Sequence, residues 1–193
     1  FGYKLGVDLP GENRGFIPNA KFYDKIYGEG RWSANTIISV AIGQGEILAT
    51  PLQIANLCTS IANRGWFITP HVVKAIQDTI MPPELLEKRY PTIEKKYFDE
   101  VADGIEVCGK TGTAQNPHGR DHSAFMGFAP YHNPKIAVCV YVENAGFGAT
   151  YGVPIGSLII EKYLTGKISP ERKHIEQRML ESNTIIYSGV KKH

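Results

Sequence analysis

The sequence has no long apolar run and no strong excess of one charge. No stretch of about 18 or more apolar residues occurs, and no basic segment followed by an apolar one opens the chain. We therefore expect no membrane span and no signal segment within these residues. The net charge is +2, and the basic residues are scattered except near the C-terminus. This charge balance does not favour nucleic acid as a partner.

Cysteine is scarce, since the chain has three, at positions 58, 108 and 139. Their odd number and their spacing fit neither a zinc knuckle nor a disulfide framework. Cys58 falls on an apolar helical face and Cys139 falls in an alternating strand. Both are expected to be buried and to act as small hydrophobic residues.

A chain of 193 residues that is 42% hydrophobic suits one domain, or a large part of one, with a real core. Its clearest helix begins at Pro51, where Thr50 is a suitable N-cap and Gln53 completes a capping box. The apolar residues recur at helical spacing, and Arg64-Gly65 ends the helix. The expected buried stripe is Ile54, Leu57, Cys58 and Ile61.

Three strands are predicted in succession, at residues 105–113, 122–128 and 135–142. Their short, turn-rich connections imply antiparallel neighbours. A helix over 153–164 follows, with Ile155, Leu158 and Ile159 as its apolar stripe and Gly166 at its end. The expected fold class is α+β, with helices covering an antiparallel sheet.

The remaining segments give weaker signals. Residues 1–17 read as loop, 21–32 as a surface excursion without a period, 66–77 as strand-like, and 82–97 as a charged connector. From Lys167 onward the chain is polar and basic, which predicts a solvated tail with a short helix near residues 171–180.

The stretch GIEVCGKTGTAQ, residues 104–115, matches two unrelated motifs. From Gly104 to Thr111 it fits the phosphate-binding pattern G-x-x-x-x-G-K-T, and from Lys110 to Gly112 it fits K-T-G. The phosphate loop needs a flexible turn and then a helix opening at the lysine. Residues 105–108 favour a strand instead, and Gly112 and Asn116-Pro117 are poor helix formers. The sequence therefore favours K-T-G on a strand.

On a strand, Lys110 and Gly112 point in one direction and Thr111 and Thr113 in the other. The two threonine hydroxyls can hydrogen-bond a carboxylate. The lysine ammonium adds about 1 kcal/mol of attraction at ~4 Å in water, or about 4 kcal/mol at an effective dielectric constant of about 20. This pattern predicts a substrate with a free carboxylate.

Four ordered blocks resemble one family, the elongation-type class B penicillin-binding proteins of the penicillin-binding protein 2 group. The blocks are G-V-D-L-P-G-E (6–12), A-I-G-Q-G with T-P-L-Q (41–45 and 50–53), G-K-T-G-T-A-Q (109–115) and the strand from His122 to Ala129-Pro130. The resemblance covers roughly residues 1–164. It implies part of a penicillin-binding transpeptidase fold, which is serine β-lactamase-like. Residues 1–165 would be the C-terminal part of the transpeptidase domain, and 166–193 a polar tail.

The family resemblance also implies an activity. Such enzymes are D,D-transpeptidases, in which a serine attacks the D-Ala-D-Ala amide of a peptidoglycan stem peptide and passes the acyl group to a neighbouring amine. The implied partners are that stem peptide, β-lactams as acylating inhibitors, the cell-elongation machinery and the N-terminal part of the same protein. No cofactor is implied. The implied location is the periplasmic face of the inner membrane, with an anchoring helix outside this chain.

By the same resemblance, Lys110, Thr111, Gly112 and Thr113 are the substrate-binding residues. Lys110 would hold the donor carboxylate and tune proton transfers, and Thr111 and Thr113 would bind that carboxylate. The backbone N–H of Thr113 would be one of two oxyanion-hole donors.

The sequence also departs from the family pattern. The nucleophile motif S-x-x-K is absent from its expected place, and its one match, Ser188 to Lys191, lies in the tail. Ser33-Ala34-Asn35 imitates the second motif, S-x-N, but in the wrong order. The chain is also short between Tyr97 and Gly104. We therefore expect these residues to be inactive alone; the alternative is a non-catalytic β-lactam sensor of the same fold.

Two groups of polar residues near the K-T-G strand have more than one possible role. His118, Asp121 and His122 are close enough in sequence for a metal site, but a polar turn explains them more simply, and no metal is predicted. Glu143-Asn144 either borders the site or forms a solvated turn.

Overall fold

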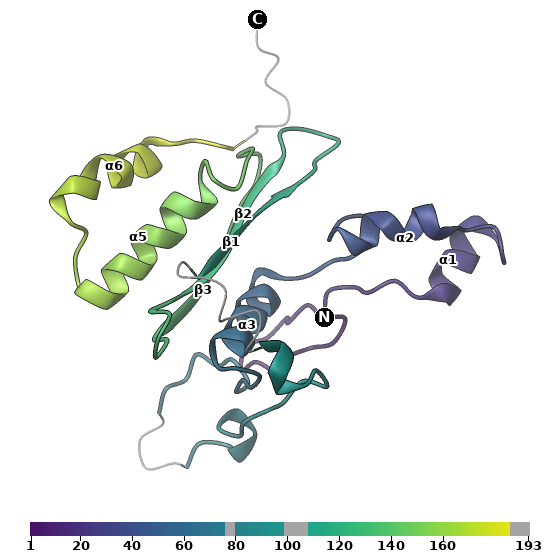
Figure 1. Ribbon diagram of the computed structural model, residues 1–193, viewed down its shortest axis with the longest axis horizontal. Coiled ribbons are helices and arrows are strands. Elements are labelled where there is room, and N and C mark those ends of the chain that lie inside the picture. The colour runs from purple at the N-terminus through teal and green to yellow at the C-terminus, as the bar shows by residue number, and fades with distance from the viewer. Residues whose placement is uncertain (76–79, 99–107, 186–193) are drawn as a thin grey trace, which may run out of the picture. The chain divides into compact units, whose positions relative to one another are not determined.

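The computed structural model describes residues 1–75, 80–98 and 108–185 of the chain (Figure 1). It divides into two compact units: residues 1–53 with 67–90, and residues 54–66 with 91–193. Helices and an antiparallel sheet occur together, so the predicted α+β class is confirmed. Within the described ranges, no helix has both the length and the apolar character needed to cross a bilayer.

The second unit contains a three-stranded antiparallel sheet in the order β1-β2-β3. Its strands are β1 (Gly109–Ala114), β2 (His122–Ala129) and β3 (Ile136–Val142). All three predicted strands are present, although residues 105–107 of the first lie outside the described residues. In the register, Thr113 lies opposite Ser123, and Phe125 lies opposite Val140. Consecutive strands pair because their connecting turns are short.

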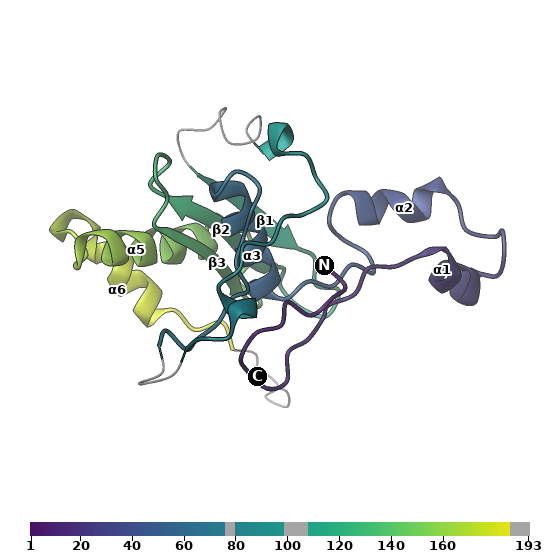
Figure 2. The same ribbon diagram turned by 90° about the horizontal axis from the view of Figure 1, so that it is seen from below.

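Helices lie on both faces of this sheet, as Figures 1 and 2 show. On one face α5 (Gly152–Thr165) packs on β2 and β3. On the other face, the part of α3 (Pro51–Ala62) that belongs to the second unit contributes Cys58 and Ala62, which pack with Phe128 of β2. The core of the unit therefore consists of two helix–sheet layers.

Three glycines spaced four residues apart, Gly148 in the loop before α5 and Gly152 and Gly156 within it, allow this segment to approach the sheet closely. A Cβ atom on Gly148 would lie 2.4 Å from the Gly112 carbonyl oxygen, and one on Gly156 would lie 2.4 Å from the Phe125 ring. A Cβ on Gly152, between them, would lie 3.0 Å from the Ala124 carbonyl carbon. Since no real Cβ tolerates the shorter of these contacts, glycine is required for this packing.

The start of α3 confirms the predicted capping box. The Thr50 N–H donates to Gln53 Oε1 at 2.9 Å, and the Gln53 N–H donates to Thr50 Oγ1 at 3.2 Å. Gln53 is also buried, and its Nε2 donates to the carbonyls of Tyr3 and Arg14, which satisfies the buried amide. Gln53 therefore takes part both in the local capping box and in contacts with residues distant in the sequence.

The predicted apolar stripes are partly wrong. Cys58 on α3 and Leu158 on α5 are buried, as expected, but Leu57 is 37% exposed and Ile159 is 44% exposed. On α3 the buried positions include Asn56 and Ser60. The Ser60 hydroxyl satisfies itself by donating to the Asn56 carbonyl at 2.9 Å, which lets a polar residue face the interior.

The first unit contains two helices that the sequence reading missed, α1 (Ala20–Tyr27) and α2 (Ala34–Ala41). Asn19 caps α1 by accepting the Phe22 N–H at 3.0 Å. The segment is held by aromatic contacts, with Phe16 and Phe22 rings 4.8 Å apart and Tyr23 and Trp32 rings 5.4 Å apart. Aromatic contacts therefore stabilise α1, and its sequence lacks the regular apolar spacing on which the helix predictions relied.

The loop predicted for residues 1–17 is confirmed apart from one isolated bridge, between Phe16 and Leu48. The strand predicted over 66–77 is wrong for its described part, where Phe67 makes a single bridge to Arg89. The connector contains the short 3-10 helix η1 (Pro83–Leu85). Pro70 and the prolines at 82 and 83 limit further ladder bonds, since proline lacks an N–H.

The predicted helix in the polar tail is confirmed as η2 (Pro170–Arg172) followed by α6 (Lys173–Glu181). This segment attaches to α5, since Arg172 Nη1 lies 2.9 Å from Glu161 Oε2 and the Ser169 N–H donates to Glu161 Oε1 at 3.0 Å. The Ser169 hydrogen bond, with the Arg172 charge, lowers the pKa of Glu161. Ile168 is buried, so the beginning of the tail is not simply solvated.

Candidate functional site

The four predicted substrate-binding residues, Lys110 to Thr113, lie consecutively on β1. β1 pairs with β2 on one side, and no strand among the described residues pairs with its other side. Lys110 and Thr111 are exposed, whereas Gly112 and Thr113 are half-buried. The structure therefore brings all four residues together at a free sheet edge.

The hydrogen-bond alternation of β1 decides which backbone groups face that edge. The Phe128 N–H donates to the Cys108 carbonyl at 2.8 Å, and these residues lie in register with the pairs that follow. Since hydrogen-bonded and non-bonded pairs alternate in an antiparallel ladder, Lys110 and Gly112 bond to β2. The N–H and C=O groups of Thr111 and Thr113 therefore point away from β2, toward the free edge.

The Lys110 side chain also reaches this edge. Its Nζ donates to the Thr111 carbonyl oxygen at 3.0 Å. The ammonium group is thus near the backbone groups that β2 leaves unpaired. A ligand carboxylate at this edge would meet a positive charge and hydrogen-bond donors together.

The side chain of Thr113 lies on the face of the sheet that α5 covers. Its Oγ1 accepts the Gly148 N–H at 3.3 Å, from the loop that joins β3 to α5. Its cross-strand neighbour Ser123 is fully buried. The sequence reading missed both Ser123 and Gly148; the four-residue glycine spacing over 148–156 was the available signal for the second.

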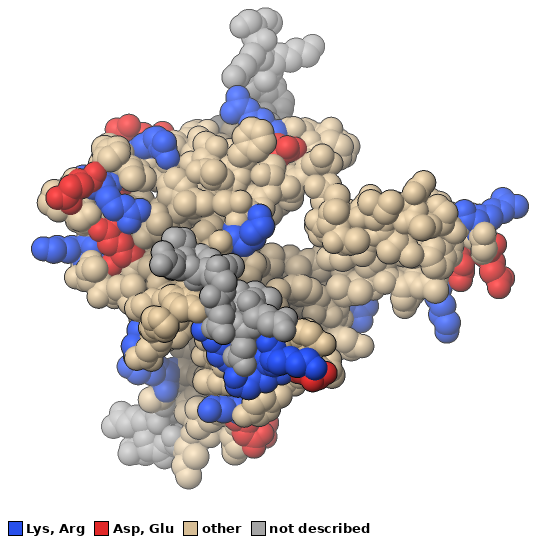
Figure 3. All heavy atoms as spheres, in the orientation of Figure 1, with Lys and Arg blue, Asp and Glu red and all other residues tan. Residues whose placement is uncertain are grey.

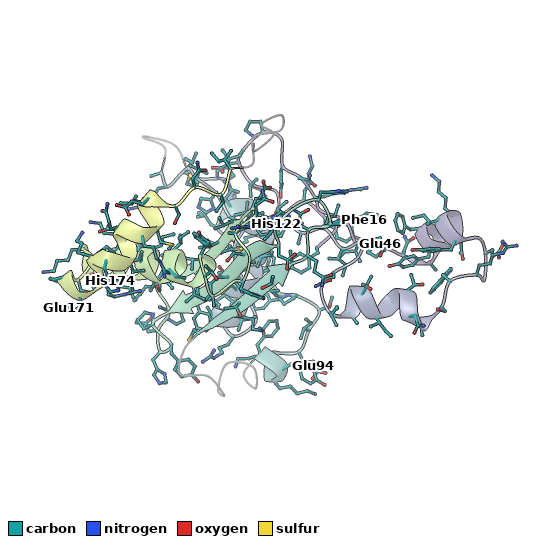
Figure 4. The ribbon with its side chains drawn as sticks, turned by 90° about the horizontal axis from the view of Figure 1, so that it is seen from above. Phe16, Glu46, Glu94, His122, Glu171 and His174 are labelled. Carbon is teal, nitrogen blue, oxygen red and sulfur yellow. The ribbon has the colours of Figure 1, made fainter. Side chains whose placement is uncertain are left out.

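The turn beyond β1 is tied to the turn beyond β3 by polar side chains. Asn116 Nδ2 donates to Asn144 Oδ1 at 3.0 Å, and the Asn116 N–H donates to Asp121 Oδ1 at 3.1 Å. The Asn144 N–H donates to Nδ1 of His122, which is labelled in Figure 4, at 3.0 Å. Asn144 therefore connects the end of β3 to the β1–β2 hairpin and is not simply a solvated turn residue.

The alternative metal site finds no support in this geometry. Asp121 and His122 already accept backbone hydrogen bonds, and His118 lies on an exposed turn. In the part of the chain that the structure describes, no group of three or more His, Cys, Asp or Glu side chains is arranged to hold a metal ion.

The other sequence candidates lie elsewhere. Ser33 stands just before α2 in the first unit and makes no capping hydrogen bond through its side chain. Ser188 to Lys191 lie outside the described residues. The phosphate-loop alternative is contradicted, because Lys110 lies inside a strand that continues to Ala114 and opens no helix.

A family model, the penicillin binding protein transpeptidase domain, matches residues 1–161. The chain is 31% identical over 214 residues to the peptidoglycan D,D-transpeptidase MrdA of Haemophilus influenzae, covering 90% of this chain and 32% of that protein. It resembles the solved structure of Pseudomonas aeruginosa PBP2 in complex with WCK 5153, with a TM-score of 0.72, 31% identity, and coverage of 89% of this chain and 44% of that one.

A second similar structure is PBP2 of Helicobacter pylori in its complex with MreC. The TM-score is 0.66 at 29% identity, over 87% of this chain and 34% of that one. The chain spans about a third of the length of the curated relatives that it matches.

The match to the H. influenzae protein runs over more residues than this chain contains, so the alignment includes positions that the chain lacks. The shortening predicted between Tyr97 and Gly104 falls on residues 99–107, which lie outside the described residues.

Proposed function

From the chain's membership of the penicillin-binding protein transpeptidase family, we propose that the whole protein is an elongation-type peptidoglycan D,D-transpeptidase. Residues 1–165 contribute the C-terminal part of its transpeptidase domain, and residues 166–193 follow as a polar extension. The observation that carries the proposal is the free edge of β1, where Lys110 and the outward backbone groups of Thr111 and Thr113 lie together.

In this proposal the acyl donor, a stem peptide ending in D-Ala-D-Ala, lies along the β1 edge. Lys110 and the hydroxyls of Thr111 and Thr113 hold its terminal carboxylate, while Gly112 keeps the strand low enough for close approach. The Thr113 N–H donates to the carbonyl oxygen as negative charge develops on it, which lowers the barrier to attack.

The nucleophile is a serine outside these residues. It attacks the penultimate D-Ala carbonyl, the amide C–N bond breaks, and D-alanine leaves. The acyl group then passes from the serine to an amine of a neighbouring stem peptide. A β-lactam enters the same edge with its own carboxylate and leaves a stable acyl-serine.

The proposed setting follows from the same relatives. The curated relatives are named peptidoglycan D,D-transpeptidase MrdA, and PBP2 of H. pylori has been solved with MreC. We infer a corresponding partner of the cell-elongation machinery for the whole protein. Its location would be the periplasmic face of the inner membrane, with an anchoring helix outside this chain.

The direct test is the intact mass of the whole protein, and of the 193-residue chain alone, before and after exposure to penicillin. The whole protein should gain one penicillin and the short chain should gain none. An unmodified whole protein would contradict the proposed function. A protein that acylates but never cross-links stem peptides would be a β-lactam sensor.

The site assignment is tested by Lys110→Ala and Thr113→Val in the whole protein. Each removes one group that binds the carboxylate, so each should slow penicillin acylation by about 10- to 100-fold, as loss of a hydrogen bond to a charged group predicts. Ser157→Ala, on the α6 side of α5, is the matched control. Unchanged acylation rates with an intact fold would remove the roles assigned here.

A further inference from the structure

One peptide group of the β3–α5 loop is held at both ends by hydroxyl side chains of the sheet. The Ser123 hydroxyl donates to the Phe147 carbonyl oxygen at 3.0 Å. The N–H of the same peptide bond, on Gly148, donates to Thr113 Oγ1 at 3.3 Å. Ser123 and Thr113 are cross-strand partners, so this peptide bridges two neighbouring side chains.

The same serine also caps α5. The N–H of Gly152, the first residue of the helix, donates to Ser123 Oγ at 3.0 Å. Tyr151 precedes the helix and makes no capping bond through its side chain. Ser123 therefore satisfies, from another element, one of the N–H groups that a helix start leaves unpaired.

These three hydrogen bonds run in one direction. An N–H group can only donate and a carbonyl can only accept, so Ser123 must accept from Gly152 and donate to Phe147. Thr113 Oγ1 must accept from Gly148, which leaves its own proton for a different acceptor. Among the residues that the structure describes, the Thr113 hydroxyl makes no further hydrogen bond. This series of hydrogen bonds begins at the positive N-terminal end of α5 and ends at the Thr113 hydroxyl, whose proton can be donated to a ligand.

A series of hydrogen bonds with this direction favours an anion as the acceptor of the Thr113 proton. Hydrogen bonds in series polarise one another, and the N-terminus of a helix carries partial positive charge. Ser123 is fully buried, so the effect of water on the first two bonds is small. The route also depends on close backbone approach, because a Cβ on Gly148 would clash with the carbonyl oxygens of Gly112 and Ala124.

We propose that Ser123 is a positioning residue that orients the Phe147–Gly148 peptide and thereby fixes Thr113 as a hydroxyl donor to the carboxylate of the acyl donor. The inference rests on the proposed function, since it assumes that Thr113 binds that carboxylate. Ser123 itself touches no reacting atom.

The test measures acylation of the whole protein by penicillin and by penicillin methyl ester, which lacks the free carboxylate. The informative quantity is the ratio of the two second-order rate constants. Ser123→Ala should lower this ratio about tenfold, the effect of weakening one hydrogen bond to a charged group. The rate with the ester should stay within about twofold of the unaltered protein.

Four further variants make the readout specific. Thr113→Val should lower the same ratio, and Ser123→Ala combined with Thr113→Val should lower it no further than Thr113→Val alone, because both residues act through one hydroxyl. Ser157→Ala, a serine of α5 outside this chain of bonds, should leave the ratio unchanged. If Ser123→Ala does not fold, Ser123→Cys keeps the volume with a weak hydrogen-bonding group and should still lower the ratio.

Each outcome decides a different point. A ratio unchanged in the Ser123 variants, or an equal slowing with penicillin and its ester, would reduce Ser123 to a structural cap of α5. A ratio unchanged in Thr113→Val would overturn the carboxylate role of Thr113 and this inference with it. No acylation of the unaltered protein would overturn the proposed function itself.

Discussion

Burial changes the chemistry of single residues, and Cys58 is the clearest case. Its side chain is 2% exposed and packs with Ala62 and Phe128. Burial raises the pKa of its thiol to about 12, with Cys139 and Cys108 nearby adding in the same direction. Burial also raises the thiol pKa of Cys108 and Cys139. Cys58 therefore behaves as the small hydrophobic residue that the sequence predicted.

At this residue scale, the raised pKa predicts the sign of a pH effect. The folded thiol keeps its proton up to a pH of about 12, whereas the unfolded thiol loses it near pH 8.5. The unfolded state therefore binds fewer protons between these values, and stability falls as the pH rises through them, by at most about 1.4 kcal/mol per pH unit. Denaturant unfolding from pH 8 to pH 11 should show a smaller loss of stability in Cys58→Ala than in the unaltered chain.

The alkylation of thiols gives an independent check. At pH 8 the native chain should leave Cys58 unmodified by iodoacetamide while the unfolded chain reacts, because the thiolate is the nucleophile. Rapid native modification of Cys58, mapped by peptide mass, would contradict its burial.

At the scale of elements, the packing of α5 on the sheet depends on the absence of side chains. Gly148, Gly152 and Gly156 lie against the backbone or side chains of β1 and β2. At each of these positions an added Cβ atom would come too close to the sheet. Glycine inside a helix is unfavourable by roughly 0.5–1 kcal/mol relative to alanine. The close packing must offset that cost, and it also places the loop that contacts Thr113.

Gly156→Ala tests this packing. Intrinsic helix propensity alone predicts a more stable protein, but the new Cβ would lie 2.4 Å from the Phe125 ring. We expect a net loss of about 1–3 kcal/mol from overpacking, measured by denaturant unfolding. Adding Phe125→Leu should recover part of the loss, because the smaller side chain leaves room. A stabilised single variant would show that α5 is not tightly seated.

At the scale of the whole molecule, the chain exposes apolar surface that a stable monomer normally covers. No residue of α2 is buried, and Ile38 is 57% exposed. Residues 33–45 carry no charged side chain, and the α2 surface is uncharged in Figure 3. The curated relatives are about three times as long as this chain. Contiguous exposed apolar surface of this kind promotes association.

We therefore expect the purified 193-residue chain to self-associate. Light scattering after size exclusion should give a mass that rises with concentration. Replacing Ile37 and Ile38 together by asparagine should reduce that rise, because α2 is solvated in the monomer and its apolar face is the proposed contact. A monomeric mass at every concentration for the unaltered chain would contradict this prediction.

The sequence by itself determined the features that depend on neighbours in the chain. The capping box at Thr50, the side-chain alternation predicted for β3, the helix stop at Gly166 and the K-T-G-T motif all involve residues a few positions apart. Local hydrogen bonds and a fixed side-chain period decide such features, so they can be predicted from the sequence without knowledge of the fold.

Only the tertiary structure decided which groups face the β1 edge and what supports them. The outward direction of the Thr113 N–H depends on the register with β2, and the role of Ser123 depends on a loop 24 residues away in the chain. The exposure of Leu57 and Ile159 likewise depends on which helix sides meet the sheet. These properties come from contacts between distant residues, and their geometry exists only once the layers pack.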